Sequence, residues 1–417
     1  MWQRLTLGNF KSFREADIPL GPFTVIVGTN ASGKSNIRDA FRFLHGVGRT
    51  YRLGDVVGGK FTDGERVWHG IRGGAKEIAF AGQEAFGLAA QFQMHGRDGQ
   101  PHQLAYRLVV QSNGSGLRVQ QDSLLDGTET IYDTHPNGRP AAGYDPNYIG
   151  AGRPVGPHGG FHIEKYSSSS AVLNQTSIPL RFDEDASFFR DNVEAYFRSV
   201  RFFDLNPEAM RRATDPGQTE LGDQGENLSS VLKAICEDQA KKAAMLEWVK
   251  ELTPMDAVDF RFPEDHEGKV VVRLVEADGR QISVASASDG TLRLLALAAA
   301  LLGPHPARVY FFEELENGIH PTRLHLLLQL IEKTVRTKKM TQVIATTHSP
   351  DLLGLLSESA RDHALLVYRL PHHADSKVKR IVDLPGAREI MAKQSAGRLH
   401  ASGWLEDAVA FTEGGDP

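Results

Sequence analysis

The chain has 417 residues, 41% of them hydrophobic, and a formal net charge of −5. This composition is ordinary for a globular protein of one large domain or two, and the negative charge gives no global attraction to nucleic acid. No uncharged apolar stretch is long enough to span a bilayer, no secretory leader begins the chain, and the single cysteine, Cys236, excludes an internal disulfide. We therefore expect a cytoplasmic protein without a membrane partner.

The N-terminal residues predict a β-hairpin and then a third strand. Residues 5–13 and 16–20 alternate apolar and polar side chains, and we expect them to form a hairpin beside the strand at 23–27. That apolar strand runs directly into Gly28-Thr-Asn-Ala-Ser-Gly-Lys-Ser35, which matches the pattern G-x-x-x-x-G-K-[ST], and residues 37–44 continue with helical periodicity. Strand, glycine-framed loop and helix in this order predict a phosphate-binding loop.

Each residue type in this loop suits the binding of a nucleoside triphosphate. Backbone N–H groups converge on the phosphates at the start of the helix. Lys34 would reach the β- and γ-phosphates, and the hydroxyl of Ser35 would ligate Mg²⁺. The residues expected around the nucleotide are Asn30, Ala31, Ser32, Gly33, Lys34, Ser35 and Asn36.

The next part of the chain predicts loops and short strands. Residues 46–74 are rich in glycine with several basic side chains, and we interpret them as a loop. Four alternating segments then predict an antiparallel sheet: 76–80, 89–94, 103–110 and 116–121. Residues 133–177 are dense in Gly, Pro, Ser, Asn and His without apolar periodicity, and they predict a long loop.

Two helices are expected after this loop. Residues 185–200 carry aromatic and aliphatic side chains at helical spacing, and residues 227–252 continue one apolar face over their length. Heptads are not sustained anywhere in the chain, so the sequence predicts no long coiled-coil arm.

The C-terminal half alternates strands with helices. Strands are expected at 270–275, 280–284, 308–312 and 341–347, and a long apolar helix at 292–302. This alternation predicts a mainly parallel sheet whose ligands bind at the carboxyl ends of the strands.

Acidic residues and a histidine follow two of these strands. Glu313 can hold Mg²⁺ at the end of its strand, and Glu314 can orient and deprotonate the attacking water. His348 follows the next strand, where its imidazole could contact the γ-phosphate. Ser288-Asp-Gly290 opens the apolar helix and offers a second anion site through its N–H groups and hydroxyl. Glu316 is expected to orient its neighbours.

These motifs, in this order, resemble the ABC-class ATPases, and within them the group of RecF, SMC and overcoming-lysogenization-defect (OLD) proteins. The resemblance depends on four stretches: Asn9-Phe-Lys-Ser-Phe13 ahead of the phosphate loop, residues 287–297 as the signature motif, residues 313–321 as the acidic motif, and residues 346–350 with the switch histidine.

The resemblance implies an α/β fold, the P-loop head of ABC-type ATPases, with a mainly parallel core sheet, an antiparallel β-subdomain and a helical insertion. We expect residues 1–75 to form the N-terminal part of the head, 76–132 its antiparallel part, 133–260 the insertion, and 261–417 the C-terminal part of the head.

The resemblance also implies a homodimer, or a higher oligomer, that holds two ATP molecules with Mg²⁺ between its subunits. Ser288 and Gly290 would then act on the partner's nucleotide, and hydrolysis at Glu314 would reopen the dimer. Lys11 and Ser12 would lie near the nucleotide, although a lysine at a sheet edge is an equal alternative.

Three departures from the group limit the transfer. No glutamine occupies a clear position for the loop that couples the metal to motion. Glu313 stands where aspartate is usual. The C-terminal metal-dependent nuclease (TOPRIM) domain of OLD nucleases has no counterpart in residues 351–417, so we expect a separately encoded effector such as a nuclease.

The sequence thus favours an ATPase switch in DNA metabolism, foremost in anti-phage defence, with double-stranded DNA as a candidate partner. A RecF-like repair accessory and an assembly scaffold or inhibitor that binds ATP with little turnover are the alternatives.

Overall fold

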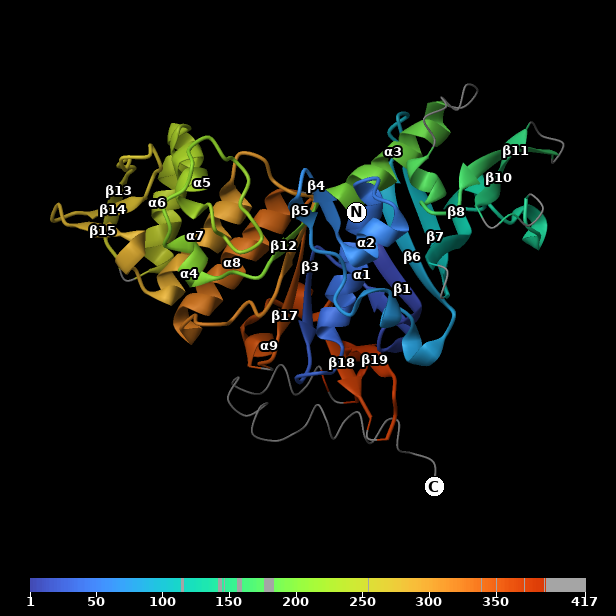
Figure 1. The fold of residues 1–417 in the computed structure, drawn as a ribbon. Helices are drawn as coiled ribbons and strands as arrows, with labels where there is room; N and C mark the ends of the chain where they lie inside the picture. The colour runs from blue at the N-terminus through green and yellow to red at the C-terminus, as the bar shows by residue number, and fades with distance from the viewer. Residues whose placement is uncertain are drawn as a thin grey trace. The chain divides into compact units, whose positions relative to one another are not determined.

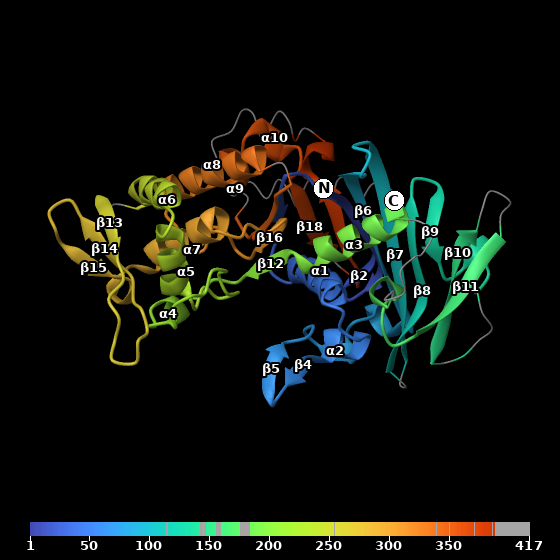
Figure 2. The same ribbon diagram turned by 90° about the horizontal axis from the view of Figure 1, so that it is seen from above.

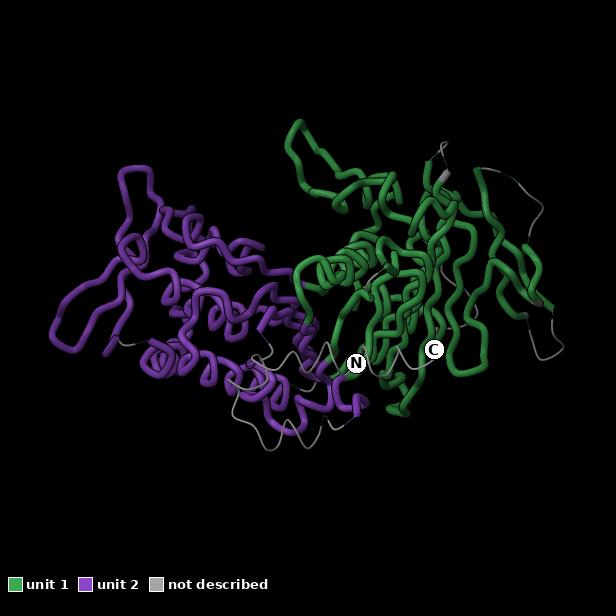
Figure 3. The backbone as a smooth tube through the Cα atoms, turned by 90° about the horizontal axis from the view of Figure 1, so that it is seen from below, with its two compact units in different colours: residues 1–21, 28–200, 365–380 green, residues 22–27, 201–364, 381–417 purple. Residues whose placement is uncertain are grey.

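The computed structural model describes residues 1–387 apart from 114–115, 142–144, 146, 156–159, 176–183, 254, 339, 350, 371 and 386. The chain divides into two compact units, each assembled from three stretches of sequence (Figure 3). Unit 1 contains residues 1–21, 28–200 and 365–380, and unit 2 contains residues 22–27, 201–364 and 381 onward. The four-part division expected from the sequence stays a prediction. None of the described helices is long and apolar enough to cross a membrane.

Unit 1 is built on an eight-stranded antiparallel sheet with the order β11-β10-β9-β8-β7-β6-β1-β2 (Figure 1). Its strands are β1 (Trp2–Phe10), β2 (Phe13–Pro19), β6 (Ala85–His95), β7 (Pro101–Asn113), β8 (Gly116–Asp126), β9 (Glu129–Asp133), β10 (Tyr148–Val155) and β11 (Gly160–Ser167). The predicted antiparallel sheet is thereby confirmed.

Two helices, α1 (Lys34–Gly48) and α3 (Glu184–Arg198), pack side by side and supply the core of unit 1 (Figure 2). The ring of Trp2 lies 4.7 Å from that of Phe41 in α1 and 5.4 Å from that of Phe197 in α3, and all three are fully buried. A Cβ atom at Gly48 would lie 2.5 Å from the backbone nitrogen of Arg198, so only glycine permits this approach of the two helices. Aromatic packing therefore holds the helix that follows the phosphate loop.

Several expectations for unit 1 were wrong in detail. The β1–β2 hairpin forms as predicted, but its sheet neighbour is β6 and not the strand at 23–27. Residues 46–74 are not merely a loop, because they contain α2 (Leu53–Gly58) and a hairpin of β4 (Lys60–Thr62) and β5 (Glu65–Trp68). Alternation of side chains indicates a strand but does not identify its hydrogen-bonding partner.

Two more segments of unit 1 differ from expectation. Residues 76–80 form no strand, since short 3₁₀ turns occupy 74–76 and 80–82. The predicted long loop at 133–177 contains the paired strands β10 and β11, whose described residues are mostly exposed or half-buried. A ribbon with little buried surface needs no apolar alternation, which explains why the pattern was missed.

Unit 2 contains four neighbouring strands in the order β12-β16-β17-β3: β12 (Val200–Phe203), β16 (Val309–Phe312), β17 (Gln342–Thr347) and β3 (Phe23–Val27). β16 pairs with β17, and β17 with β3, in parallel. Around them lie α4 (Pro207–Met210), α5 (Leu228–Cys236), α6 (Gln239–Leu252), α7 (Asp289–Leu302), α8 (Pro321–Thr337), α9 (Leu352–Leu355) and α10 (Glu358–Arg361). A separate antiparallel sheet consists of β13 (Ala257–Arg261), β14 (Arg273–Glu276) and β15 (Gln281–Ser283).

The single helix expected at 227–252 is wrong, because α5 ends at Cys236 and α6 begins at Gln239. Asp238 separates them: its side chain accepts hydrogen bonds from the backbone N–H groups of Ala240 and Lys241 and caps α6. A side chain that satisfies free helical N–H groups starts a new helix even where the apolar face continues.

Candidate nucleotide-binding site

The phosphate loop lies in unit 1, immediately after β3. Two of its residues must be glycine: a Cβ atom at Gly28 would lie 2.4 Å from the carbonyl oxygen of Val367, and Gly33 has a φ of +118° at the start of α1. Ala31 also lies in the left-handed region, with φ +61°. The loop leads into the N-terminus of a 15-residue helix, a place where an anion is stabilised.

Lys34 is held over this loop. Its Nζ donates to the carbonyl oxygens of Gly28, at 2.5 Å, and Thr29, at 2.8 Å, and the residue is 6% exposed. Ser32 is also buried, and its Oγ finds no hydrogen-bond partner among the described residues. A buried hydroxyl without a partner, in the same loop as a buried ammonium, fits the oxygen atoms of a bound phosphate.

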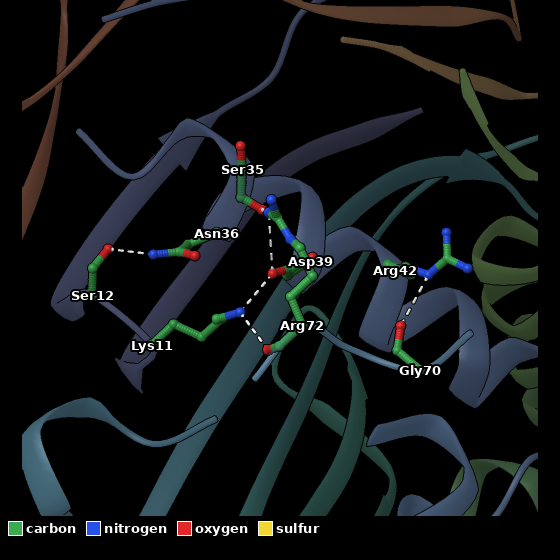
Figure 4. A network of polar contacts seen from close by, with 8 residues as sticks. All are labelled: Lys11, Ser12, Ser35, Asn36, Asp39, Arg42, Gly70 and Arg72. Carbon is green, nitrogen blue, oxygen red and sulfur yellow. Dashed lines mark hydrogen bonds and ion pairs between the residues drawn. The ribbon is translucent and has the colours of Figure 1, made fainter. Parts of the chain in front are cut away.

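Asn36 connects the loop to the N-terminal hairpin. Its Nδ2 donates to Ser12 Oγ at 2.7 Å (Figure 4), and Ser376 Oγ donates to the same atom at 2.8 Å. Ser376 begins β19 (Ser376–Arg380), which pairs with β18 (Leu365–Arg369). Ser12 therefore fixes α1 against two other parts of unit 1.

A buried carboxylate, Asp39, gathers two cations beside the loop (Figure 4). Its Oδ2 accepts from Lys11 Nζ at 2.6 Å and from Arg72 Nη2 at 3.3 Å. Lys11 also donates to the carbonyl oxygen of Arg72, and Arg72 donates to that of Ser35, each at 2.8 Å. The side chain of Lys11 is therefore 8% exposed and paired with Asp39 of α1, and its place near the nucleotide stays a prediction.

Sequence reasoning missed Asp39 and Arg72. Asp39 follows the phosphate motif by one helical turn, and Arg72 stands among several basic residues of a glycine-rich segment. No spacing rule singled out either residue, and only the folded chain brings them to Ser35.

The acidic motif lies in unit 2, where β16 ends. Glu314 has a φ of +46°, which is rare for a residue with a side chain, and its backbone N–H donates to Thr346 Oγ1 at 3.0 Å. His348 Nε2 and Glu314 Oε1 are 3.2 Å apart, and Asn317 Nδ2 donates to Glu314 Oε2 at 3.3 Å. The two residues chosen from sequence for hydrolysis are therefore neighbours, held at the ends of parallel strands β16 and β17.

Glu316 supports this pair, as expected. Its Oε1 accepts from the backbone N–H of His348 at 2.9 Å, which ties the histidine loop to the acidic loop. Its Oε2 is buried without a hydrogen-bond partner among the described residues. Glu313 lies at the end of β16, where its N–H donates to the carbonyl oxygen of Phe203 at 2.9 Å.

The signature residues form the start of α7. Ser288 caps this helix, with its Oγ accepting from the N–H of Thr291 at 3.2 Å. A Cβ atom at Gly290 would lie 2.6 Å from the carbonyl oxygen of Gly318, so glycine allows α7 to pack on the acidic loop. The signature and acidic motifs are thus in direct contact within unit 2.

Comparisons with known proteins found similar sequences and a similar fold. A family model described as an AAA ATPase domain matches residues 1–65, and another, described as an AAA domain, putative AbiEii toxin, Type IV TA system, matches residues 155–354. The chain is 56% identical over 46 residues to the chromosome partition protein Smc of Methanocaldococcus jannaschii, which is 11% of this chain and 4% of that protein. It is 27% identical over 143 residues to the OLD nuclease of Thermus scotoductus, which is 34% of this chain and 23% of the nuclease.

The matched stretches therefore span only a small part of either curated relative. A solved SMC head, bound to the C-winged helix domain of ScpA, aligns with 91% of this chain and 97% of its own, with a TM-score of 0.50 and 16% identity. At that identity the likeness concerns the fold.

Proposed function

Because the chain is an ABC-type ATPase of the group that contains RecF, SMC and OLD proteins, we propose that it is an ATP-hydrolysing switch whose two copies close around two ATP molecules. Lys34 of one copy and Ser288 with Gly290 of the other bind the same triphosphate. The buried Ser32 hydroxyl and Lys34 ammonium support the phosphate site in unit 1. Ser35 and Glu313 are the proposed ligands of Mg²⁺, which would neutralise charge on the phosphate oxygens.

The Glu314–His348 pair is the observation that carries the proposal. Glu314 accepts the proton of the attacking water, while Asn317 and His348 hold its carboxylate in place. The side chain of Glu314 is 49% exposed and that of His348 is 35% exposed, so water reaches both. The left-handed backbone at Glu314 persists because neighbouring hydrogen bonds fix it, as is usual for strained residues at functional sites.

ATP turnover tests the chemistry. We expect Glu314→Gln to bind ATP but to release phosphate about a hundredfold more slowly than wild type, since it lacks the proton acceptor. Lys34→Ala should lose nucleotide binding itself. Glu237→Gln, the same change at an exposed position in unit 2, is the matched control and should behave as wild type. Equal turnover by Glu314→Gln and Glu237→Gln would remove Glu314 from the mechanism.

We further propose that the switch acts in DNA metabolism and serves anti-phage defence with a separately encoded effector. The family model named for a putative AbiEii toxin and the similarity to an OLD nuclease support this reading. Expression together with the neighbouring genes should reduce phage plaquing, and Lys34→Ala should abolish that protection. Full protection by Lys34→Ala would show that ATP is not the trigger.

A role as DNA-repair accessory is the alternative, and the short match to a chromosome partition protein supports only a role on DNA. Stimulation of ATP turnover by double-stranded DNA, without any effect on phage, would support it. ATP binding without measurable turnover by wild type would favour a scaffold or inhibitor over both.

A further inference from the structure

The segment between β12 and α5 contacts two of the motifs described above. At its start, the carbonyl oxygen of Phe203 accepts from the N–H of Glu313, and the ring of Phe203 stacks on that of Phe312, with ring centroids 5.2 Å apart. The chain then forms the short helix α4, which ends at Met210. Arg211 follows directly, and all these residues belong to unit 2.

Arg211 clamps the signature loop. Its Nη2 donates to the carbonyl oxygen of Ala287 at 3.0 Å and to Asp289 Oδ1 at 2.6 Å. Its Nη1 donates to Glu208 Oε1 at 2.9 Å. Ala287 and Asp289 flank Ser288 in the sequence, so one guanidinium joins the backbone before the signature serine to the carboxylate after it.

This clamp has two physical consequences. The planar guanidinium presents its donors in a rigid fork, so it limits the positions that the loop can take. It also neutralises the carboxylate of Asp289, whose side chain is 64% exposed beside Ser288. An unpaired carboxylate at that place would repel an incoming triphosphate.

We propose that Arg211 is a positioning residue for the signature loop, and that residues 203–211 couple this loop to the end of β16. The inference rests on the proposed function, in which Ser288 serves the partner's ATP while Glu313 and Glu314 serve the chain's own. Within one chain, residues 203–211 then link the acidic residues that serve its own ATP to the serine that serves the partner's ATP. Arg211 itself touches neither nucleotide.

The test separates nucleotide binding from closure. Each variant is made in the hydrolysis-deficient Glu314→Gln background, its affinity for a fluorescent ATP analogue is titrated, and its ATP-dependent dimerisation is measured by analytical ultracentrifugation. Arg211→Ala should weaken dimerisation about tenfold or more, because two charge-assisted contacts are lost, while its nucleotide affinity stays within about twofold of the parent. Arg211→Lys should lie between, since an ammonium cannot reproduce the fork.

Arg212→Ala is the matched control, because it removes the same charge from the exposed neighbour, whose side chain makes no hydrogen bond or ion pair with the described residues. It should dimerise as the parent does. Ser288→Ala should lose dimerisation. If Ser288→Ala loses dimerisation while Arg211→Ala matches Arg212→Ala, the clamp is refuted and the proposed function stands. If Ser288→Ala dimerises normally, the proposed function itself fails. Should Arg211→Ala not fold, Arg211→Lys decides by the same two measurements.

Discussion

The buried carboxylate of Asp39 gives the sharpest prediction about stability. It is 1% exposed, and Lys11, one of its two cationic partners, is 8% exposed. Breaking a buried ion pair from one side typically costs about 3–5 kcal/mol, because the remaining charge stays buried without compensation. Lys11 keeps one acceptor here, the carbonyl oxygen of Arg72, so we expect the lower end, about 3 kcal/mol, for Asp39→Ala.

Asp39→Asn refines the estimate. The asparagine side chain has nearly the shape of aspartate and keeps one oxygen that accepts hydrogen bonds, so this variant should lose about 1.5–2 kcal/mol of the free energy of unfolding. The matched control is Asp17→Asn, because Asp17 pairs with Arg4 in the same unit, with side chains that are 51% and 43% exposed. That surface pair should contribute less than about 1 kcal/mol.

Urea unfolding followed by circular dichroism measures both changes. A double-mutant cycle of Lys11→Met and Asp39→Asn gives the interaction energy between these two side chains, which should exceed about 1 kcal/mol. Nucleotide affinity should fall as well, because Arg72, the second partner of Asp39, contacts Ser35. If Asp39→Asn costs no more than Asp17→Asn, the pair does not stabilise unit 1 and the reasoning is refuted.

Three further predictions concern other parts of the chain. Burial raises the pKa of Asp122 to about 7, although Tyr132 Oη and the N–H of Val172 donate to its carboxylate. Since the pKa of the folded state lies above that of the unfolded state, the free energy of unfolding should fall as the pH rises from about 4 to 7, by at most about 4 kcal/mol. Asp122→Asn should flatten that part of the pH profile. An unchanged slope in the variant would contradict this assignment. Gly290→Ala places a methyl group 2.6 Å from the backbone oxygen of Gly318. It should lower the free energy of unfolding by about 1–3 kcal/mol and slow ATP turnover. Gly54→Ala, at a position with open space around it, is the control and should have little effect on either. Asp238→Ala removes the cap of α6 and should lower the free energy of unfolding, measured with urea, by about 1 kcal/mol. A loss near zero would show that the Asp238 cap does not stabilise the start of α6.

Local features of the sequence were enough to predict the secondary structure at the motifs. The two glycines around the phosphate loop, the apolar run before it and the helix after it lie within a few residues of one another, and the structure has strand, loop and helix at those places. The same holds for Glu313 and Glu314 at the end of β16 and His348 after β17. Short-range periodicity and backbone constraints decide such elements, and a single sequence carries both.

The tertiary structure alone decided which distant residues meet. Lys11, Asp39 and Arg72 come from three separate stretches of chain, and Arg211 reaches the signature loop from 76 residues away. Likewise the N-terminal hairpin pairs with β6, and the ribbon of β10 and β11 forms where no apolar pattern exists. Such contacts depend on packing and desolvation over the whole fold. A charged side chain has many possible partners in the sequence, and the folded chain sets which of them lies within reach and is buried with it.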